Sequence, residues 1–193
     1  MKILLIFFLK IKYTDSDPSK WRGDLPALPH ITNAILRLWS TGFLFHRKEW
    51  ERLEYLGDKV LMFCVLRFAT TKYLQYYTPS EIKMVATFLV SNKLLAAYSL
   101  TLGLHKQNQM ERNGITKKVA DAFEAYIGAF YLSEGEEATT KYLDQLMSPL
   151  FELVLKGIQG RRAVEGGRDA GRIMEVIASY FNMGFLIKLP RLR

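Results

Sequence analysis

The chain has 193 residues, a net charge of +8, and a composition that is 49% hydrophobic and 13% aromatic. This composition is typical of one globular domain with a sizeable core, and it excludes an intrinsically disordered chain. The single cysteine, Cys64, excludes an internal disulfide and cysteine-pair metal sites; within VLMFCVLRF we expect it to be a buried hydrophobic residue. The positive charge favours an anionic partner, either a nucleic acid or an acidic membrane surface.

The N-terminal segment MKILLIFFLKIKY contains an apolar stretch at residues 3–9. This stretch is too short to span a bilayer, which needs about 20 residues. No small-residue cleavage site follows it, so we expect a non-secretory extension over residues 1–27. No other stretch is apolar enough for a membrane span, and we expect no membrane partner. The expected location is intracellular, in the nucleus or cytoplasm rather than the mitochondrion.

Helical patterns dominate from about residue 31 and alternating strand patterns are missing, which predicts an all-α fold. The periodicity predicts a first long helix over residues 48–77, which ends before TPSE. Thr78 or Ser80 can cap a second helix, with Pro79 in its first turn. We expect this second helix to continue through the segment IKMVATFLVSNKLLAAYSL.

A loop that is rich in glycine and asparagine follows at about residues 103–114. Thr116 is then expected to cap a helix with the sequence KKVADAFEAYIGAFYL, which Glu134 and Gly135 interrupt, and a last helix is predicted over residues 137–155. Residues 156–193 form a basic tail with a net charge of +5, in which GIQGRRAVEGGRDAGR is linker-like. The tail either neutralises nucleic-acid phosphates or only keeps the chain soluble.

Two of the predicted helices carry acidic residues on one face and a glycine in the same turn. The acids are Glu51, Glu54 and Asp58 on the first helix, beside Gly57, and Asp121 and Glu124 on the other, beside Gly128. The spacings i, i+3 and i+7 place the acids of one helix on one face. Like charges at such spacings repel by about 0.2–0.5 kcal/mol per pair, so their grouping needs an explanation.

Two such helices could meet across the core and bring four carboxylates together. A hard divalent cation turns this repulsion into binding, and Mg²⁺ suits a few carboxylates and several waters. The spacing alone leaves a metal site and a solvated acidic face both open. The mid-helix glycines indicate a close approach of another helix or of a partner subunit.

The same stretches resemble the ribonuclease III family. ERLEYLGDKVL at residues 51–61 is similar to the signature NERLEFLGDxxL, and ADAFEAYIGAFYL at residues 120–132 is similar to ADxxEAxIGAxYL. PSEIKMVATFLVSNKLLA, between them, also resembles a helix of the family. The resemblance covers residues 28–155 and implies the helical ribonuclease III endonuclease fold, which dimerises through the signature helix. Residues 156–193 contain no recognisable double-stranded-RNA-binding domain.

The resemblance implies an endoribonuclease that cuts double-stranded RNA with Mg²⁺, for which Mn²⁺ can substitute, and leaves 5′-phosphates, 3′-hydroxyls and short 3′ overhangs. A homodimer is implied, with a heterodimer with a related subunit as the alternative. The implied metal ligands and catalytic residues are Glu54, Asp58, Asp121 and Glu124. Glu51 and Gly57 are implied to lie near the dimer interface and the RNA. The candidate phosphate contacts are Lys93, for which a solvated surface lysine is the alternative, Lys117 and Lys118.

Two departures from the family pattern lie just upstream of the signature. Trp50 stands where the family has asparagine, and FLFHRKEW is a shortened form of the usual preceding segment. Because residues 156–193 show no double-stranded-RNA-binding domain, we expect either a member without it or a truncated or diverged chain. A member without it, together with the two departures, would support the alternative of a catalytically silent RNA-binding or scaffold subunit, such as a mitochondrial ribosomal protein of this fold. The retention of all four acids favours the enzyme.

Overall fold

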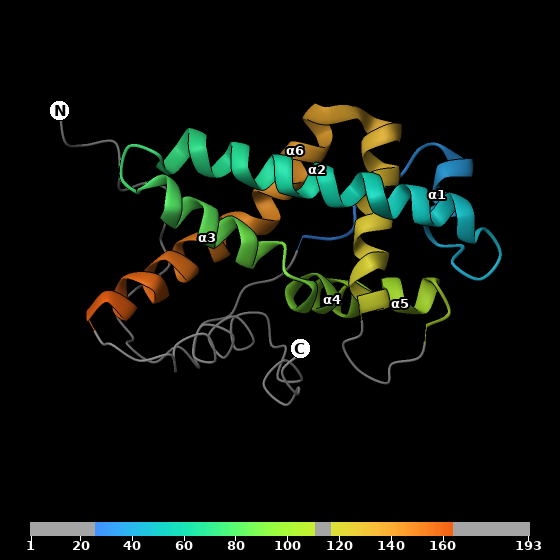
Figure 1. The fold of residues 1–193 in the computed structure, drawn as a ribbon. Helices are drawn as coiled ribbons and strands as arrows, with labels where there is room; N and C mark the ends of the chain where they lie inside the picture. Colours follow the sequence, from blue (N-terminus) through green and yellow to red (C-terminus); the bar gives the residue numbers. More distant parts are fainter. Residues whose placement is uncertain (1–25, 111–116, 164–193) are drawn as a thin grey trace.

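The computed structural model describes residues 26–110 and 117–163. The regular elements in these ranges are α1 (Ala34–Ser40), α2 (Arg47–Tyr73), α3 (Pro79–Leu89), α4 (Asn92–Thr101), α5 (Leu104–Gln107) and α6 (Lys117–Ala163). All of them are helices, so the all-α prediction is confirmed for the described part of the chain. Figure 1 shows α6 bent in the middle, with its first half (yellow) crossing α2 and its second half (orange) turned towards α3.

The bend in α6 lies at Gly135, whose φ of 86° and ψ of 179° interrupt the helix where the sequence predicts it. Glu134 remains helical, and its carboxylate accepts hydrogen bonds from the backbone N–H and the hydroxyl of Thr32, both at 2.7 Å. These contacts attach the segment before α1 to the bend. Beyond the bend the helix continues to Ala163, so the interpretation of residues 157–163 as a linker is wrong. The rest of the predicted tail and nearly all of the N-terminal extension lie outside the described residues.

The connection from α2 to α3 confirms the capping prediction. Helix α2 ends at Tyr73, a few residues before the predicted end. The Thr78 hydroxyl accepts a hydrogen bond from the backbone N–H of Glu81 at 3.3 Å, and the Glu81 carboxylate accepts one from the backbone N–H of Thr78 at 2.8 Å. This capping box, with Pro79 in the first turn, satisfies N–H groups that have no partner inside the helix.

The prediction of one continuous helix from residue 79 to residue 100 is wrong. The helix is interrupted after Leu89, and α3 and α4 form an angle of 43°. Helix α3 buries only one stripe, whereas residues 94–99 of α4 are all buried. A straight continuation of α3 would leave part of that apolar segment in water. Within the described ranges no single helix has the length and composition of a membrane span; α3 and α4 meet that criterion only as a bent pair.

Two further predictions concern the loop before α6 and the single cysteine. The predicted loop at residues 103–114 contains the short helix α5, while its last residues and the expected cap Thr116 lie outside the described ranges. Cys64 is only 1% exposed, as predicted, and packs with the apolar faces of α2 and α6.

The crossing of α2 and α6 depends on two glycines that face each other. A methyl group at Gly57 would overlap the backbone carbonyl of Glu124, and one at Gly128 would overlap the carbonyl of Leu53. The two backbones therefore touch, which only glycine permits at these positions. Gly57 is thus explained by a helix of the same chain, and its implied place at the dimer interface is corrected. This contact also brings the acidic faces of the two helices together.

Candidate metal centre

Three of the predicted acids meet beside the glycine crossing. Glu54 extends from α2, and Asp121 and Glu124 extend from the first half of α6. One carboxylate oxygen from each residue lies within 4.8 Å of the other two. Asp121 and Glu124 are each 6% exposed, and the Glu54 side chain is 23% exposed. The centre is therefore open to solvent on the side of Glu54 and closed on the side of α6.

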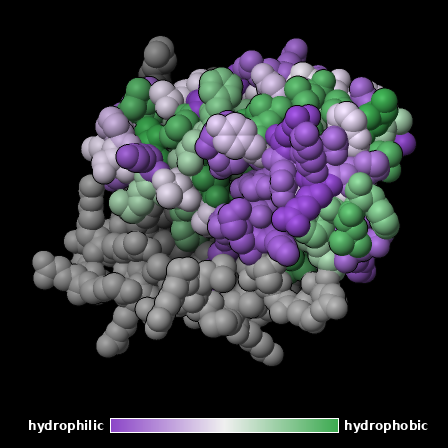
Figure 2. Space-filling view, turned by 45° about the vertical axis from the view of Figure 1, so that its right-hand side comes forward, coloured by the Kyte–Doolittle hydropathy of each residue, from purple (hydrophilic) through white to green (hydrophobic). Residues whose placement is uncertain are grey.

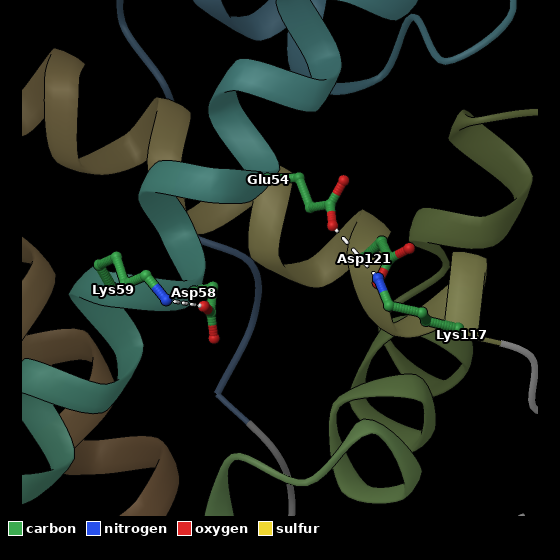
Figure 3. A network of polar contacts seen from close by, with 5 residues as sticks. All are labelled: Glu54, Asp58, Lys59, Lys117 and Asp121. Carbon is green, nitrogen blue, oxygen red and sulfur yellow. Dashed lines mark hydrogen bonds and ion pairs between the residues drawn. The ribbon is translucent and has the colours of Figure 1, made fainter.

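The fourth predicted acid, Asp58, does not belong to this close group among the described residues. It lies one turn further along α2, and its carboxylate accepts a hydrogen bond from the Lys59 ammonium at 2.7 Å. Figure 3 shows Glu54 pointing across to α6, while Asp58 pairs with its neighbour on α2. Its charge still reaches the centre, because it helps to raise the pKa of Glu124. The structure thus brings together three of the four acids that were expected to converge.

Lys117, at the start of α6, occupies the opening of the centre. Its ammonium lies 3.0 Å from an oxygen of Asp121 and 3.3 Å from an oxygen of Glu54, so it bridges the two helices (Figure 3). The Lys117 side chain is 66% exposed. The sequence predicts this lysine only as a phosphate contact; its spacing of four residues from Asp121 is the signal that could have indicated the ion pair.

The three carboxyl groups of the centre have raised pKa values, mainly because they are buried. Burial is the main cause for Glu124, and the negative charges of Asp121, Asp58 and Glu54 add to it, which raises its pKa to about 7. Burial also raises the pKa of Glu54 and of Asp121, and Lys117 offsets part of both shifts. Without a bound metal ion, bringing the carboxylates together is therefore unfavourable, and one lysine does not fully compensate their charge.

The donor set fits a hard divalent cation. Its members are carboxylate oxygens, the ligands that Mg²⁺ and Mn²⁺ prefer over nitrogen or sulfur. Burial and the negative charges of its neighbours raise the pKa of Glu124, and a doubly charged ion would stabilise its ionised form. Glu54, Asp121 and Glu124 are the residues that could hold such an ion, with Asp58 close enough to act on it through its charge.

The other predicted residues lie around the centre or away from it. Glu51 is exposed and pairs with Arg47 at 2.8 Å. The Lys118 ammonium lies 5.5 Å from the centre of the Phe43 ring, beside Lys117 at the start of α6. Lys93 is half-buried on α4, and none of the contacts found within the described ranges joins it to the acids.

The stretch that carries these acids is similar to known proteins. Residues 51–135, which include all five acids discussed above, match the family model described as the ribonuclease III domain. The chain is 29% identical over 176 residues to Ribonuclease 3 of Chlorobium luteolum, covering 75% of this chain and 63% of the relative. It is 35% identical over 111 residues to Ribonuclease 3 of Staphylococcus saprophyticus, covering 53% of this chain and 44% of the relative.

A solved structure shares the fold. The chain superposes on the structure of Dicer from Pichia stipitis with a TM-score of 0.56 and 24% sequence identity, covering 80% of this chain and 72% of that one. The fold and the acidic centre thus define an all-α domain of the ribonuclease III type. Residues 51–135 thus match the ribonuclease III domain, and the chain is similar to curated proteins of that name. It spans about 63% and 44% of the length of the two relatives named above.

Proposed function

We propose that the protein is an intracellular, divalent-metal-dependent endoribonuclease that cleaves double-stranded RNA and leaves 5′-phosphate and 3′-hydroxyl ends with short 3′ overhangs. The match of residues 51–135 to the ribonuclease III domain supports the class of reaction. The observation that carries the proposal is the close approach, within 4.8 Å, of carboxylate oxygens from Glu54, Asp121 and Glu124 on two different helices. Such a group is unfavourable unless it has a cation to bind.

In this proposal the three close carboxylates hold Mg²⁺, or Mn²⁺ in its place, with Asp58 as the fourth acid one turn away. When bound, the ion supplies positive charge to a phosphate oxygen and lowers the pKa of a water molecule. Glu124 has to lose its proton before it can act as a carboxylate ligand, because its pKa is about 7. Lys117 has to leave the oxygens of Glu54 and Asp121, and its long exposed side chain allows this.

The lysines beside the centre suit a phosphate backbone. Once displaced, the Lys117 ammonium is free to contact a phosphate next to the cleaved bond, and the exposed Lys118 side chain lies on the same rim. Phosphate contacts of this kind do not depend on base sequence and weaken as salt concentration rises. Duplex RNA is recognised mainly through its shape, phosphates and 2′-hydroxyl groups, so a base-reading element is not required.

We also propose a homodimer that forms through α2. The apolar side chains of Tyr55, Phe63 and Leu66 are 70%, 51% and 36% exposed, and their spacing of eight and three residues places them on one face of α2. Figure 2 shows hydrophobic side chains beside a broad hydrophilic area on one face of the molecule. Large apolar side chains aligned on one helix are typical of a protein interface. Two centres, one from each protomer, would then serve the two strands of a duplex.

The test is a cleavage assay on long duplex RNA with Mg²⁺ or Mn²⁺. We expect cutting by the wild-type protein, and a loss of at least about 100-fold for Glu124→Gln or Asp121→Asn, because each substitution removes a ligand charge from the centre. Glu137→Gln, which removes an exposed carboxylate from the other half of α6, is the matched control and should cut normally.

Circular dichroism and sedimentation must show that every variant is folded and has the assembly state of the wild type. If the folded dimer leaves duplex RNA intact across a range of both ions, the enzyme proposal is wrong. An RNA-binding or scaffold role then takes its place, and co-sedimentation with ribosomes without metal binding would support that role.

A further inference from the structure

A buried contact cluster joins the beginnings of the two helices that carry the acids. Trp50 and Asn108 are 2% and 1% exposed, and the indole N–H of Trp50 donates a hydrogen bond to Oδ1 of Asn108 at 3.0 Å. The same oxygen accepts the backbone N–H of Phe43 at 3.4 Å, and the Asn108 amide donates to the carbonyl of Leu104 at 3.1 Å. Asn108 therefore ties three parts of the chain together: the α1–α2 loop, α2 and α5.

The Phe43 ring extends this cluster to α6. Its edge packs on the Trp50 ring, with centroids 5.0 Å apart and an angle of 71° between the planes. The Lys118 ammonium lies 5.5 Å from the Phe43 centroid, within the range of a cation–π contact. A path of direct contacts thus runs from Trp50 on α2, through Phe43, to Lys118 on α6.

The positions of these contacts relative to the acids give the cluster its significance. Trp50 lies four residues before Glu54 and Lys118 lies three residues before Asp121, so each contact residue is one helical turn from an acid on the same face. The glycine crossing fixes the helices on the far side of the centre, at Gly57. On the near side, where α2 and α6 begin, the cluster contacts α2 through Trp50 and α6 through the Lys118 ammonium.

We propose that Trp50, Phe43 and Asn108 are positioning residues that set the separation between Glu54 and Asp121 and so determine the metal affinity of the centre. This inference rests on the proposed metal-dependent function. It also assigns a role to Trp50, the residue that departs from the family signature: its indole supplies the N–H donor that Asn108 accepts. The cluster touches neither metal nor RNA in this proposal.

The experiment compares Mn²⁺ affinity with thermal stability in the metal-free protein. Trp50→Phe keeps an aromatic ring but removes the N–H donor, and Asn108→Ala removes the acceptor. We expect either variant to weaken Mn²⁺ binding, measured by calorimetry, by about threefold to tenfold, because the effect is transmitted through packed neighbours. The double variant should lose little more than Asn108→Ala alone, since that substitution already removes the contact with Trp50.

Thr139→Val is the matched control. It removes a buried side-chain hydrogen bond, from the Thr139 hydroxyl to the carbonyl of Gly135 at 2.8 Å, in the other half of α6. We expect it to lower the melting temperature as Trp50→Phe does while leaving Mn²⁺ affinity unchanged. Wild-type affinity in Trp50→Phe, or an equal loss of affinity in Thr139→Val, would overturn the positioning role alone. A wild-type protein that binds no Mn²⁺ would overturn the metal centre itself, and the positioning role with it.

Discussion

Lowering the pH should weaken metal binding to the isolated protein, because the ion and a proton compete for Glu124. The pKa of this carboxyl group is raised to about 7 by burial and by the negative charges of Asp121, Asp58 and Glu54. A protonated carboxyl group is a poor ligand, so the ion has to displace the proton. The competition therefore falls within the pH range in which the protein can be handled.

The size of the effect follows from the pKa. With a pKa of about 7, about 90% of Glu124 is ionised at pH 8 and about 10% at pH 6. If one proton is displaced for each ion bound, the affinity at pH 6 is about tenfold lower than at pH 8, or about 1.4 kcal/mol. At pH 7 the binding of one ion should release about half a proton.

Calorimetry with Mn²⁺ at pH 6, 7 and 8, in buffers of different ionisation enthalpy, measures both quantities. Glu124→Gln cannot titrate at this position, so its weaker binding should lose most of the pH dependence. Equal wild-type affinity at pH 6 and pH 8, without proton release, would refute the reasoning.

The same pKa has a consequence for stability. The folded pKa of Glu124 lies above its ordinary value of 4.5, so the folded state binds more protons between those two pH values. The stability of the metal-free protein should therefore decrease as the pH rises through this window.

Three other substitutions test separate parts of the structure. Lys117→Met should strengthen Mn²⁺ binding by up to about fivefold, since it removes a competing ammonium from an exposed ion pair, and it should lower RNA cleavage. Unchanged affinity would contradict a competition between Lys117 and the ion. Gly57→Ala should lower the free energy of unfolding in urea by about 1–3 kcal/mol or more, because its methyl group overlaps the carbonyl of Glu124; unchanged stability would contradict the close crossing. Phe63→Asp should give a folded monomer in sedimentation, since this side chain is 51% exposed in the protomer; a persistent dimer would exclude the proposed interface.

Local features of the fold were predictable from the sequence. The capping box at Thr78 and Glu81 involves residues three apart, and the break at Gly135 requires a backbone conformation that glycine adopts easily. The predictions that were wrong concern features that depend on packing between residues far apart in the sequence. The helix is interrupted between α3 and α4 because residues 94–99 are all buried in the core. The apolar pattern of that segment alone did not indicate which helices it packs against.

The acidic centre shows the same division. Helical spacing put Glu54 and Asp58 on one face of their helix, but tertiary packing left Asp58 with Lys59 and outside the close group. The glycines predicted a close approach by another helix or a partner subunit, and the structure identifies α6 of the same chain. The choice between them depends on which surfaces are buried, which a one-dimensional pattern does not contain.

The sequence by itself determined that this is a helical protein with acids grouped on two helix faces, each beside a glycine, because spacing and backbone preference are local properties. Only the tertiary structure decided that three of the acids meet, that Lys117 lies between two of them, and that Trp50 of α2 is hydrogen-bonded to Asn108 at the end of α5. Lys117 and Glu54 are 63 positions apart in the chain, and the packing of α2 against α6 brings them together. Trp50 and Asn108 are 58 positions apart, and they meet where the end of α5 reaches α2.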